Sequence, residues 1–153
     1  MGQIADYVIT LLEKILDEPC DREKRYAWAL GDESPKTGRR ARLPFDAVWE
    51  SRKLIAEIDE DQHRDSMPFW DKPDRLTVSG IDRGQQRRLY DERKRNAARH
   101  EGYVMLEIPW PRCPALPDRD RAADRQALIA MLAEVGVPTY SRAPMDAAGT
   151  TST

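Results

Sequence analysis

Residues 43–50 and 53–60 form two segments rich in apolar side chains, and only Ser51 and Arg52 separate them. So short a connection predicts an antiparallel β-hairpin with Trp49 opposite Leu54. In this register one face is wholly apolar, and the other carries most of the acids. The apolar face holds Phe45, Ala47, Trp49, Leu54, Ala56 and Ile58, and the other holds Asp46, Val48, Ile55, Glu57 and Asp59. A slip of one residue would destroy this segregation, which supports the register.

The predicted hairpin makes Asp46 and Glu57 neighbours across two strands, with Asp59 two residues further along. Three carboxylates on one patch repel each other unless a cation or protons neutralise them. Mg²⁺ or Mn²⁺ is a suitable cation, since hard divalent ions prefer carboxylate oxygens and water. The alternative is that these acids only solvate an exposed sheet face. The cross-strand geometry and the basic segment described next favour a metal site.

Basic side chains are concentrated in two places although the net charge is only -2. Residues 83–99 hold seven of them against Asp91 and Glu92, and a second group lies within residues 36–42. Basic surface around an acidic spot is what a metal-dependent nuclease requires, because cations attract the phosphates of nucleic acid. The arginines expected to contact nucleic acid are Arg40, Arg42, Arg83, Arg87, Arg88 and Arg95.

Two further side chains are candidates for chemistry. His63 follows the acidic strand and could act as general acid or base, or position a water, since imidazole titrates near neutral pH. It could equally be a loop histidine that caps a backbone group. Lys94 could point at the acidic patch and stabilise the scissile phosphate, or form an ordinary surface ion pair with Asp91. Whether Glu13 or Glu23 adds an N-terminal acid stays open.

Hydrophobic periodicity predicts an α/β (α+β) fold with a mixed sheet flanked by helices. We expect helices over 3–18, 83–101 and 118–135, and strands over 25–30, 43–50, 53–60 and 103–110. Residues 1–140 are then one domain, and residues 141–153 a disordered tail. Two cysteines with no metal-binding spacing, and no membrane segment or signal peptide, predict a cytoplasmic location.

The segments FDAVW, LIAEIDEDQH and RRLYDERKRNAARHEGYVMLEIP together resemble the PD-(D/E)XK nuclease superfamily. The most similar branch is that of the very-short-patch-repair endonucleases and relatives with an E…D…xHD-type motif. The resemblance covers roughly residues 25–109. It implies a restriction-endonuclease-like core of order αβββαβ, here followed by a C-terminal helix, and a Mg²⁺-dependent endonuclease.

The resemblance also implies roles for individual residues. Asp46 matches the aspartate of the first half-motif and Glu57 the acid of the second, so both would bind metal. Asp59 stands where the superfamily usually has lysine and would bind metal or orient water. His63 would assist in place of that lysine, and Lys94 would be a migrated lysine. The cysteines that bind zinc in true short-patch-repair enzymes are absent, so mismatch repair is not implied.

The expected substrate is DNA, in repair, restriction and phage defence, or a mobile-element context. A homodimer, or another partner, is one way for so short a chain to cut both strands. The alternatives are an inactive nuclease fold that binds nucleic acid or protein, and a toxin that cleaves RNA.

Overall fold

The computed structural model describes residues 1–60, 83–110 and 120–139. Its elements are α1 (Gln3–Leu16), β1 (Asp21–Glu33), β2 (Arg40–Trp49), a 3₁₀ turn η1 (Glu50–Arg52), β3 (Leu54–Glu60), α2 (Arg83–His100), β4 (Val104–Trp110) and α3 (Ala122–Glu134). The strands form a four-stranded sheet of order β1-β2-β3-β4. The β1–β2 and β2–β3 pairs are antiparallel and β3–β4 is parallel, which confirms the mixed α/β class.

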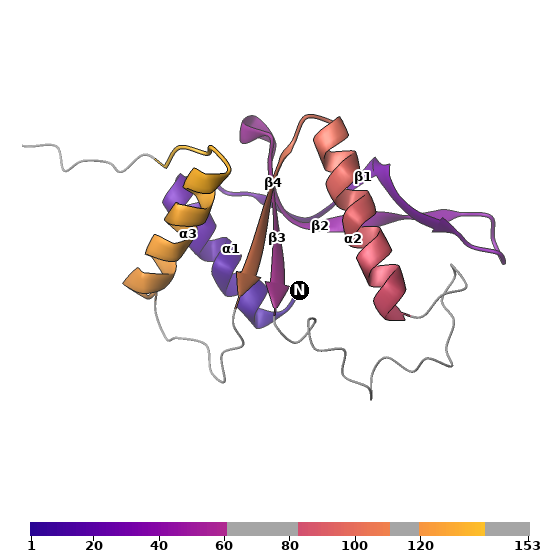
Figure 1. Ribbon diagram of the computed structural model, residues 1–153, viewed down its shortest axis with the longest axis horizontal. Helices are drawn as coiled ribbons and strands as arrows, with labels where there is room; N and C mark the ends of the chain where they lie inside the picture. The colour runs from indigo at the N-terminus through magenta and orange to yellow at the C-terminus, as the bar shows by residue number, and fades with distance from the viewer. Residues whose placement is uncertain (61–82, 111–119, 140–153) are drawn as a thin grey trace, which may run out of the picture.

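Helices cover both faces of the sheet (Figure 1). On one face α1 and α3 pack together against an apolar surface that includes Trp49, Leu54 and Ile108. On the other face α2 contributes Ala98 to a smaller cluster that includes Phe45, Ile55 and Tyr103. The smaller cluster fills only part of the space beneath α2, which leaves room for the polar site described below.

The β2–β3 hairpin has the register expected from the sequence. Trp49 lies opposite Leu54, Val48 opposite Ile55, and Ala47 opposite Ala56. The turn uses Lys53 in the left-handed region, with a φ of 50°, in place of a glycine. Because Ser51-Arg52 is not a strong turn dipeptide, the segregation of apolar and polar faces is what specifies this pairing.

The predicted alternation is wrong at Phe45, which packs with Val48 and Ile55 on the α2 face and not with Ala47. The interruption lies at Asp46, whose Oδ2 accepts the Ile58 N–H at 2.9 Å. On the β1 side Glu23, between the residues paired with Phe45 and Ala47, has a φ of 51°. A side-chain acceptor and a left-handed residue therefore replace regular pairing at this point.

Other predicted boundaries differ from the structure. The strand expected over 25–30 extends over Asp21–Glu33, because alternating polar side chains of β1 are half-buried at the sheet edge. The first helix ends at Leu16, with Asp17 in the left-handed region, and the last begins at Ala122. Gly102 follows α2 with a φ of 84°, as expected for a residue after a helix C-terminus. The predicted tail lies outside the described residues.

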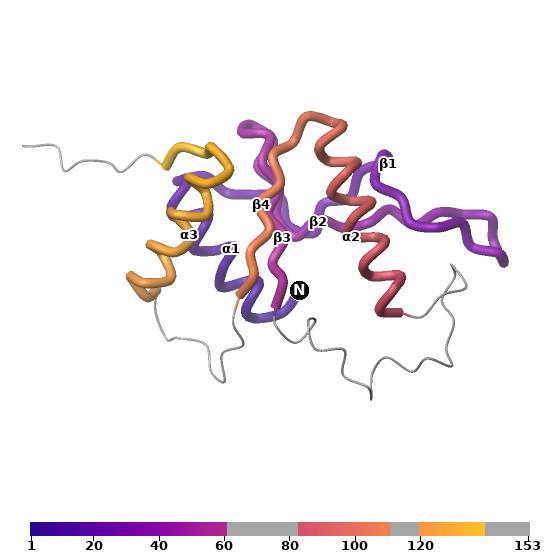
Figure 2. The backbone as a smooth tube through the Cα atoms, in the orientation of Figure 1, coloured from indigo at the N-terminus to yellow at the C-terminus, as the bar shows by residue number. Residues whose placement is uncertain are grey.

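The β1–β2 hairpin extends well past the part of β2 that pairs with β3, as the backbone trace makes clear (Figure 2). Helix α2 contacts it near the C-terminal end of β1. The Tyr90 hydroxyl accepts the Asp32 N–H at 3.0 Å, and Arg93 forms an ion pair with Asp32 at 2.8 Å. Gly31 permits this close approach, since a Cβ there would lie 3.1 Å from the Tyr90 hydroxyl oxygen.

Replacing Gly31 by alanine should therefore lower the free energy of unfolding by about 1 kcal/mol, through overpacking against Tyr90. In a Tyr90→Phe background the same change should cost less, since the nearest oxygen is gone. Urea unfolding of the four proteins measures this double-mutant cycle. Additive costs would contradict the contact as the cause.

Candidate active site

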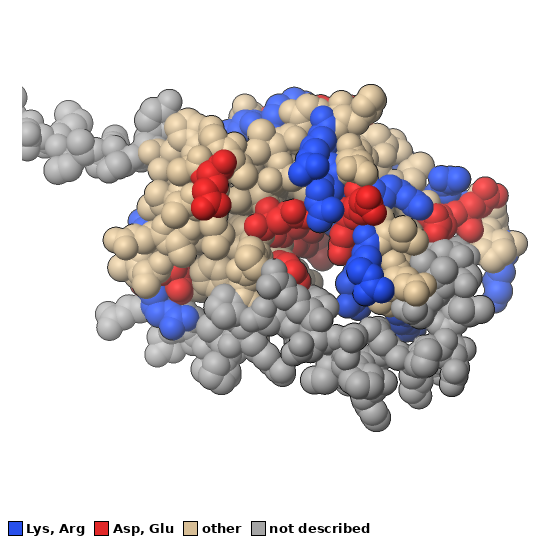
Figure 3. Space-filling model, viewed as in Figure 1, with Lys and Arg blue, Asp and Glu red and all other residues tan. Residues whose placement is uncertain are grey.

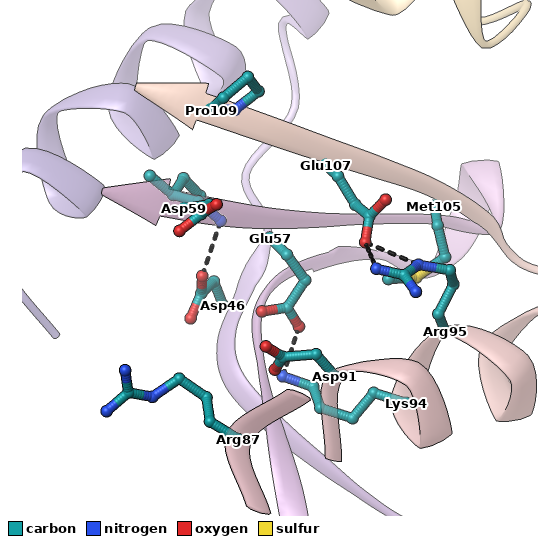
Figure 4. A pocket seen from close by; sticks show the side chains of 11 residues that line it. Asp46, Glu57, Asp59, Arg87, Asp91, Lys94, Arg95, Met105, Glu107 and Pro109 are labelled. Carbon is teal, nitrogen blue, oxygen red and sulfur yellow. Dashed lines mark hydrogen bonds and ion pairs between the residues drawn. The ribbon is translucent and has the colours of Figure 1, made fainter. Parts of the chain in front are cut away.

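Asp46, Glu57 and Asp59 line one cavity of about 500 Å³ between α2 and the ends of β3 and β4 (Figure 4). Within the described ranges, the other charged residues that line it are Arg87, Asp91, Lys94, Arg95 and Glu107. The hairpin register brings Asp46 to Glu57, and the period of two along β3 brings Asp59 to the same side. Asp46 and Glu57 thus lie on one side of the sheet, as the sequence predicted.

Glu57 is the central acid of this cavity. Its Oε1 lies 2.8 Å from Lys94 Nζ, and 22% of the Glu57 side chain and 12% of the Lys94 side chain remain exposed. The approach of Lys94 is close but not aligned as a hydrogen bond, so this buried oxygen has no hydrogen-bond donor among the residues described. Lys94 is therefore held over the acidic patch, in the place that the sequence analysis proposed for it.

Burial raises the pKa of Glu57 to about 8, against the opposing attraction of Lys94 and with help from the negative charges of Asp46 and Asp91. Burial likewise raises the pKa of Asp91, which Lys94 and Arg87 oppose. Carboxyl groups that resist ionisation are the expected result of crowding acids at one low-dielectric site. A cation in the cavity would reverse this effect.

The structure adds two acids that the sequence analysis did not select. Asp91 is one helical turn before Lys94, and its i,i+3 spacing was the available signal. Glu107 lies beside Glu57 in the parallel β3–β4 register. Arg95 donates to Glu107 from Nε at 2.8 Å. No local sequence signal identified Glu107, because its position depends on the pairing of strands far apart in the chain.

The predicted nucleic-acid contacts fall into two groups. Arg87 and Arg95 line the cavity, whereas Arg83 and Arg88 are exposed elsewhere on α2. Arg40 and Arg42 are exposed on the far part of the β1–β2 hairpin. The space-filling view places acidic side chains in a hollow that basic side chains border (Figure 3).

Three other candidates do not join this cavity or cannot be placed. Glu13 pairs with Arg22 at 3.0 Å and Glu23 with the N-terminus at 3.5 Å, and neither lines the cavity. His63 lies outside the described residues. Tyr103 is buried in the core.

The donor chemistry of the cavity fits a hard divalent cation, because among the described residues carboxylate oxygens predominate and the buried Glu57 Oε1 has no hydrogen-bond donor. The acids are not drawn into a ligand shell, however. Within residues 1–60, 83–110 and 120–139, no three histidine, cysteine or acidic side chains are grouped closely enough to hold a metal ion. The ion pair with Lys94 takes the place of such a shell around Glu57.

In the parts of the chain that the structure describes, no helix has the length and apolar character needed to cross a membrane. Comparisons of this chain with models of protein families, with curated proteins and with solved structures found no match.

Proposed function

We propose that this chain is a Mg²⁺- or Mn²⁺-dependent endonuclease that hydrolyses phosphodiester bonds in DNA. The observation that carries the proposal is the placement of Asp46, Glu57, Asp59 and Lys94 around one cavity, with Lys94 in contact with Glu57. The element order, with one helix, three strands, a helix and a strand before α3, is compatible with a restriction-endonuclease-like core. That assignment of the fold is part of the proposal.

Charge balance supports a divalent cation. Among the residues that the structure describes, five acids and three basic side chains line the cavity, and their formal charges sum to -2 before substrate enters. A phosphodiester brings a further negative charge and would be repelled. A bound divalent ion would supply a Lewis acid that activates water and neutralises charge on the phosphate. Asp46, Glu57 and Asp59 would hold that ion.

The basic residues have separate tasks in this proposal. Lys94 orients Glu57. It is also placed to donate a hydrogen bond from its ammonium to a phosphate oxygen that enters beside it. Arg95 is held by Glu107, and Arg87 lines the same cavity, so both can bind phosphates that flank the scissile bond. His63 remains a predicted general acid or base.

Asp46→Asn tests the proposal. Cleavage of double-stranded DNA should require Mg²⁺ or Mn²⁺, stop in EDTA, and fall roughly thousandfold in this variant, since a ligand to the ion loses its charge. Glu101→Gln, an exposed acid outside the cavity, is the matched control and should cleave normally. Single- and double-stranded DNA and RNA are incubated with the protein in parallel. Cleavage of RNA alone would show that the substrate is RNA and not DNA. Unchanged cleavage by Asp46→Asn would refute the assignment of the site.

The rival is a non-catalytic binding protein with the same fold. One observation favours it: Lys94 already lies against Glu57, so this acid has a positive partner without a metal ion. In that case DNA binding should persist in EDTA, with no cleavage under Mg²⁺ or Mn²⁺.

A further inference from the structure

The far part of the β1–β2 hairpin projects from the body of the protein. We call residues 33–42 the distal ribbon. Strand β3 pairs with Ala47–Trp49 of β2, whereas β1 pairs with β2 out to Glu33 opposite Arg40. The distal ribbon therefore stands clear of β3, β4, α1 and α3 (Figure 1).

The distal ribbon is strongly basic. It carries four basic residues against the single acid Glu33, which gives a net charge of +3, and these four are Lys36, Arg39, Arg40 and Arg42. All four side chains are exposed. Across the described ranges none of the four forms an ion pair, although Lys24, Arg52 and Arg93 nearer the body do. The distal ribbon is thus available to an anion.

The base of the ribbon, at residues 30–32 of β1, contacts the helix that lines the cavity. Arg93 donates to the Leu30 carbonyl at 3.2 Å and pairs with Asp32 at 2.8 Å, while Tyr90 accepts the Asp32 N–H. The same helix places Lys94, the next residue, against Glu57. One helix therefore contacts both the base of the ribbon and the cavity.

The spacing of the two sites suits a stiff ligand. Asp46 lies six residues after Arg40 along β2, which corresponds to about 20 Å at the rise of an extended strand. In duplex DNA, successive phosphates of one strand are about 3.4 Å apart along the helix axis, and the duplex stays straight over a length of about 20 Å. A span of about 20 Å therefore corresponds to roughly six base pairs, while a flexible single strand would lose entropy in joining the two sites.

We propose that the distal ribbon is a second binding surface for duplex DNA, which it grips through phosphates roughly six base pairs to one side of the bond in the cavity. This inference rests on the proposed function for the identity of the ligand. Its contribution is to substrate choice: the ribbon selects duplex DNA that continues past the cleavage site.

The test compares the ribbon variant Arg40→Gln/Arg42→Gln with the control variant Lys53→Gln/Arg99→Gln. The control removes the same amount of charge from two exposed residues outside the ribbon, just before β3 and near the C-terminal end of α2. Binding of a 30-base-pair duplex is measured by fluorescence anisotropy in EDTA over a range of salt. The ribbon variant should bind at least about tenfold more weakly, and its slope of log affinity against log salt should fall by about two, one unit for each lost phosphate contact. The control variant should bind as the unaltered protein does.

Because binding is measured in EDTA, it does not depend on cleavage. If the unaltered protein cleaves no nucleic acid, the proposed function fails, but the comparison of binding by the two variants still tests the ribbon. Equal binding by the ribbon and control variants would overturn the proposal. An equal loss of binding to a single strand or to duplex RNA would overturn the assignment of duplex DNA as the ligand. A duplex of fewer than about six base pairs cannot span both the cavity and the ribbon, so with such a duplex the difference between the two variants should disappear.

Discussion

Glu57→Gln should abolish metal-dependent cleavage and yet make the metal-free protein more stable at neutral and alkaline pH. Glutamine keeps the size of the side chain but carries no charge. Loss of about 4 kcal/mol of charge stabilisation at the cation would lower the cleavage rate roughly thousandfold. Stability should change in the opposite direction because Glu57 is a largely buried acid that resists ionisation.

The pH dependence of this effect follows from the raised pKa of Glu57, about 8 in the folded protein against an ordinary value of 4.5. Below pH 4.5 the carboxyl is protonated in both the folded and the unfolded chain, so it contributes no pH dependence. Between 4.5 and 8 the unfolded chain releases this proton first, and the stability of the unaltered protein falls as pH rises. Since part of the side chain is exposed, we expect the variant to gain about 2–3 kcal/mol over the unaltered protein by pH 8.

Urea unfolding in EDTA at pH 5 and pH 8 measures this gain, with Glu101→Gln as the control for removal of an exposed acid. The control should show no gain that depends on pH. Saturating Mg²⁺ should stabilise the unaltered protein more than Glu57→Gln, because a ligand that binds only the folded state raises its stability. A variant of equal stability at both pH values would mean that Glu57 ionises freely in the folded protein.

The register of the β2–β3 hairpin was predictable because it depends on short-range information. Apolar and acidic residues alternate in two adjacent segments, and only one pairing keeps them on separate faces. The shared location of Asp46 and Glu57 followed directly from that pairing. The parallel pairing of β3 with β4 has no such local signal, and for that reason Glu107 was not anticipated.

The position of Lys94 was only partly predictable. Its sequence spacing from Asp91 was equally compatible with a solvated ion pair on the helix surface. The direction of its side chain depends on how α2 lies across the sheet, which the contacts of Tyr90 and Arg93 with β1 determine. The departure of Phe45 from alternation had a similar origin, since it depends on the Asp46 side chain accepting the Ile58 N–H. The periodicity of apolar residues does not predict side-chain hydrogen bonds of this kind.

Lys94→Met should destabilise the protein only when Glu57 is ionised. Lys94 lies 2.8 Å from Glu57 Oε1, and its ammonium is also 5.0 Å from the centre of the Phe45 ring. Methionine keeps the apolar stem but removes the charge. Without Lys94 the pKa of Glu57 should rise further, because the ammonium is the main influence that lowers it.

The effect should appear above pH 8. Below that pH, Glu57 is protonated in the folded form of both proteins, so the electrostatic cost of losing Lys94 is small. As pH rises further, Glu57 of the unaltered protein ionises beside Lys94, whereas in the variant it must stay protonated or ionise without a partner. Between pH 7 and pH 9.5 the variant should therefore lose about 2 kcal/mol relative to the unaltered protein.

The double variant Glu57→Gln/Lys94→Met isolates the pair. With no acid to ionise at position 57, the stability of the double variant relative to Glu57→Gln should not change between pH 7 and pH 9.5. The control Arg99→Met removes an exposed cation near the end of α2, and its stability relative to the unaltered protein should not change over this range either. Cleavage by Lys94→Met should be impaired at every pH, because in the proposed function the ammonium also binds the phosphate. A pH-independent cost in the single variant would indicate an ordinary packing role for Lys94. Because the double-mutant cycle compares variants in the same metal-free buffer, its coupling energy reports the interaction of these two side chains within the cavity.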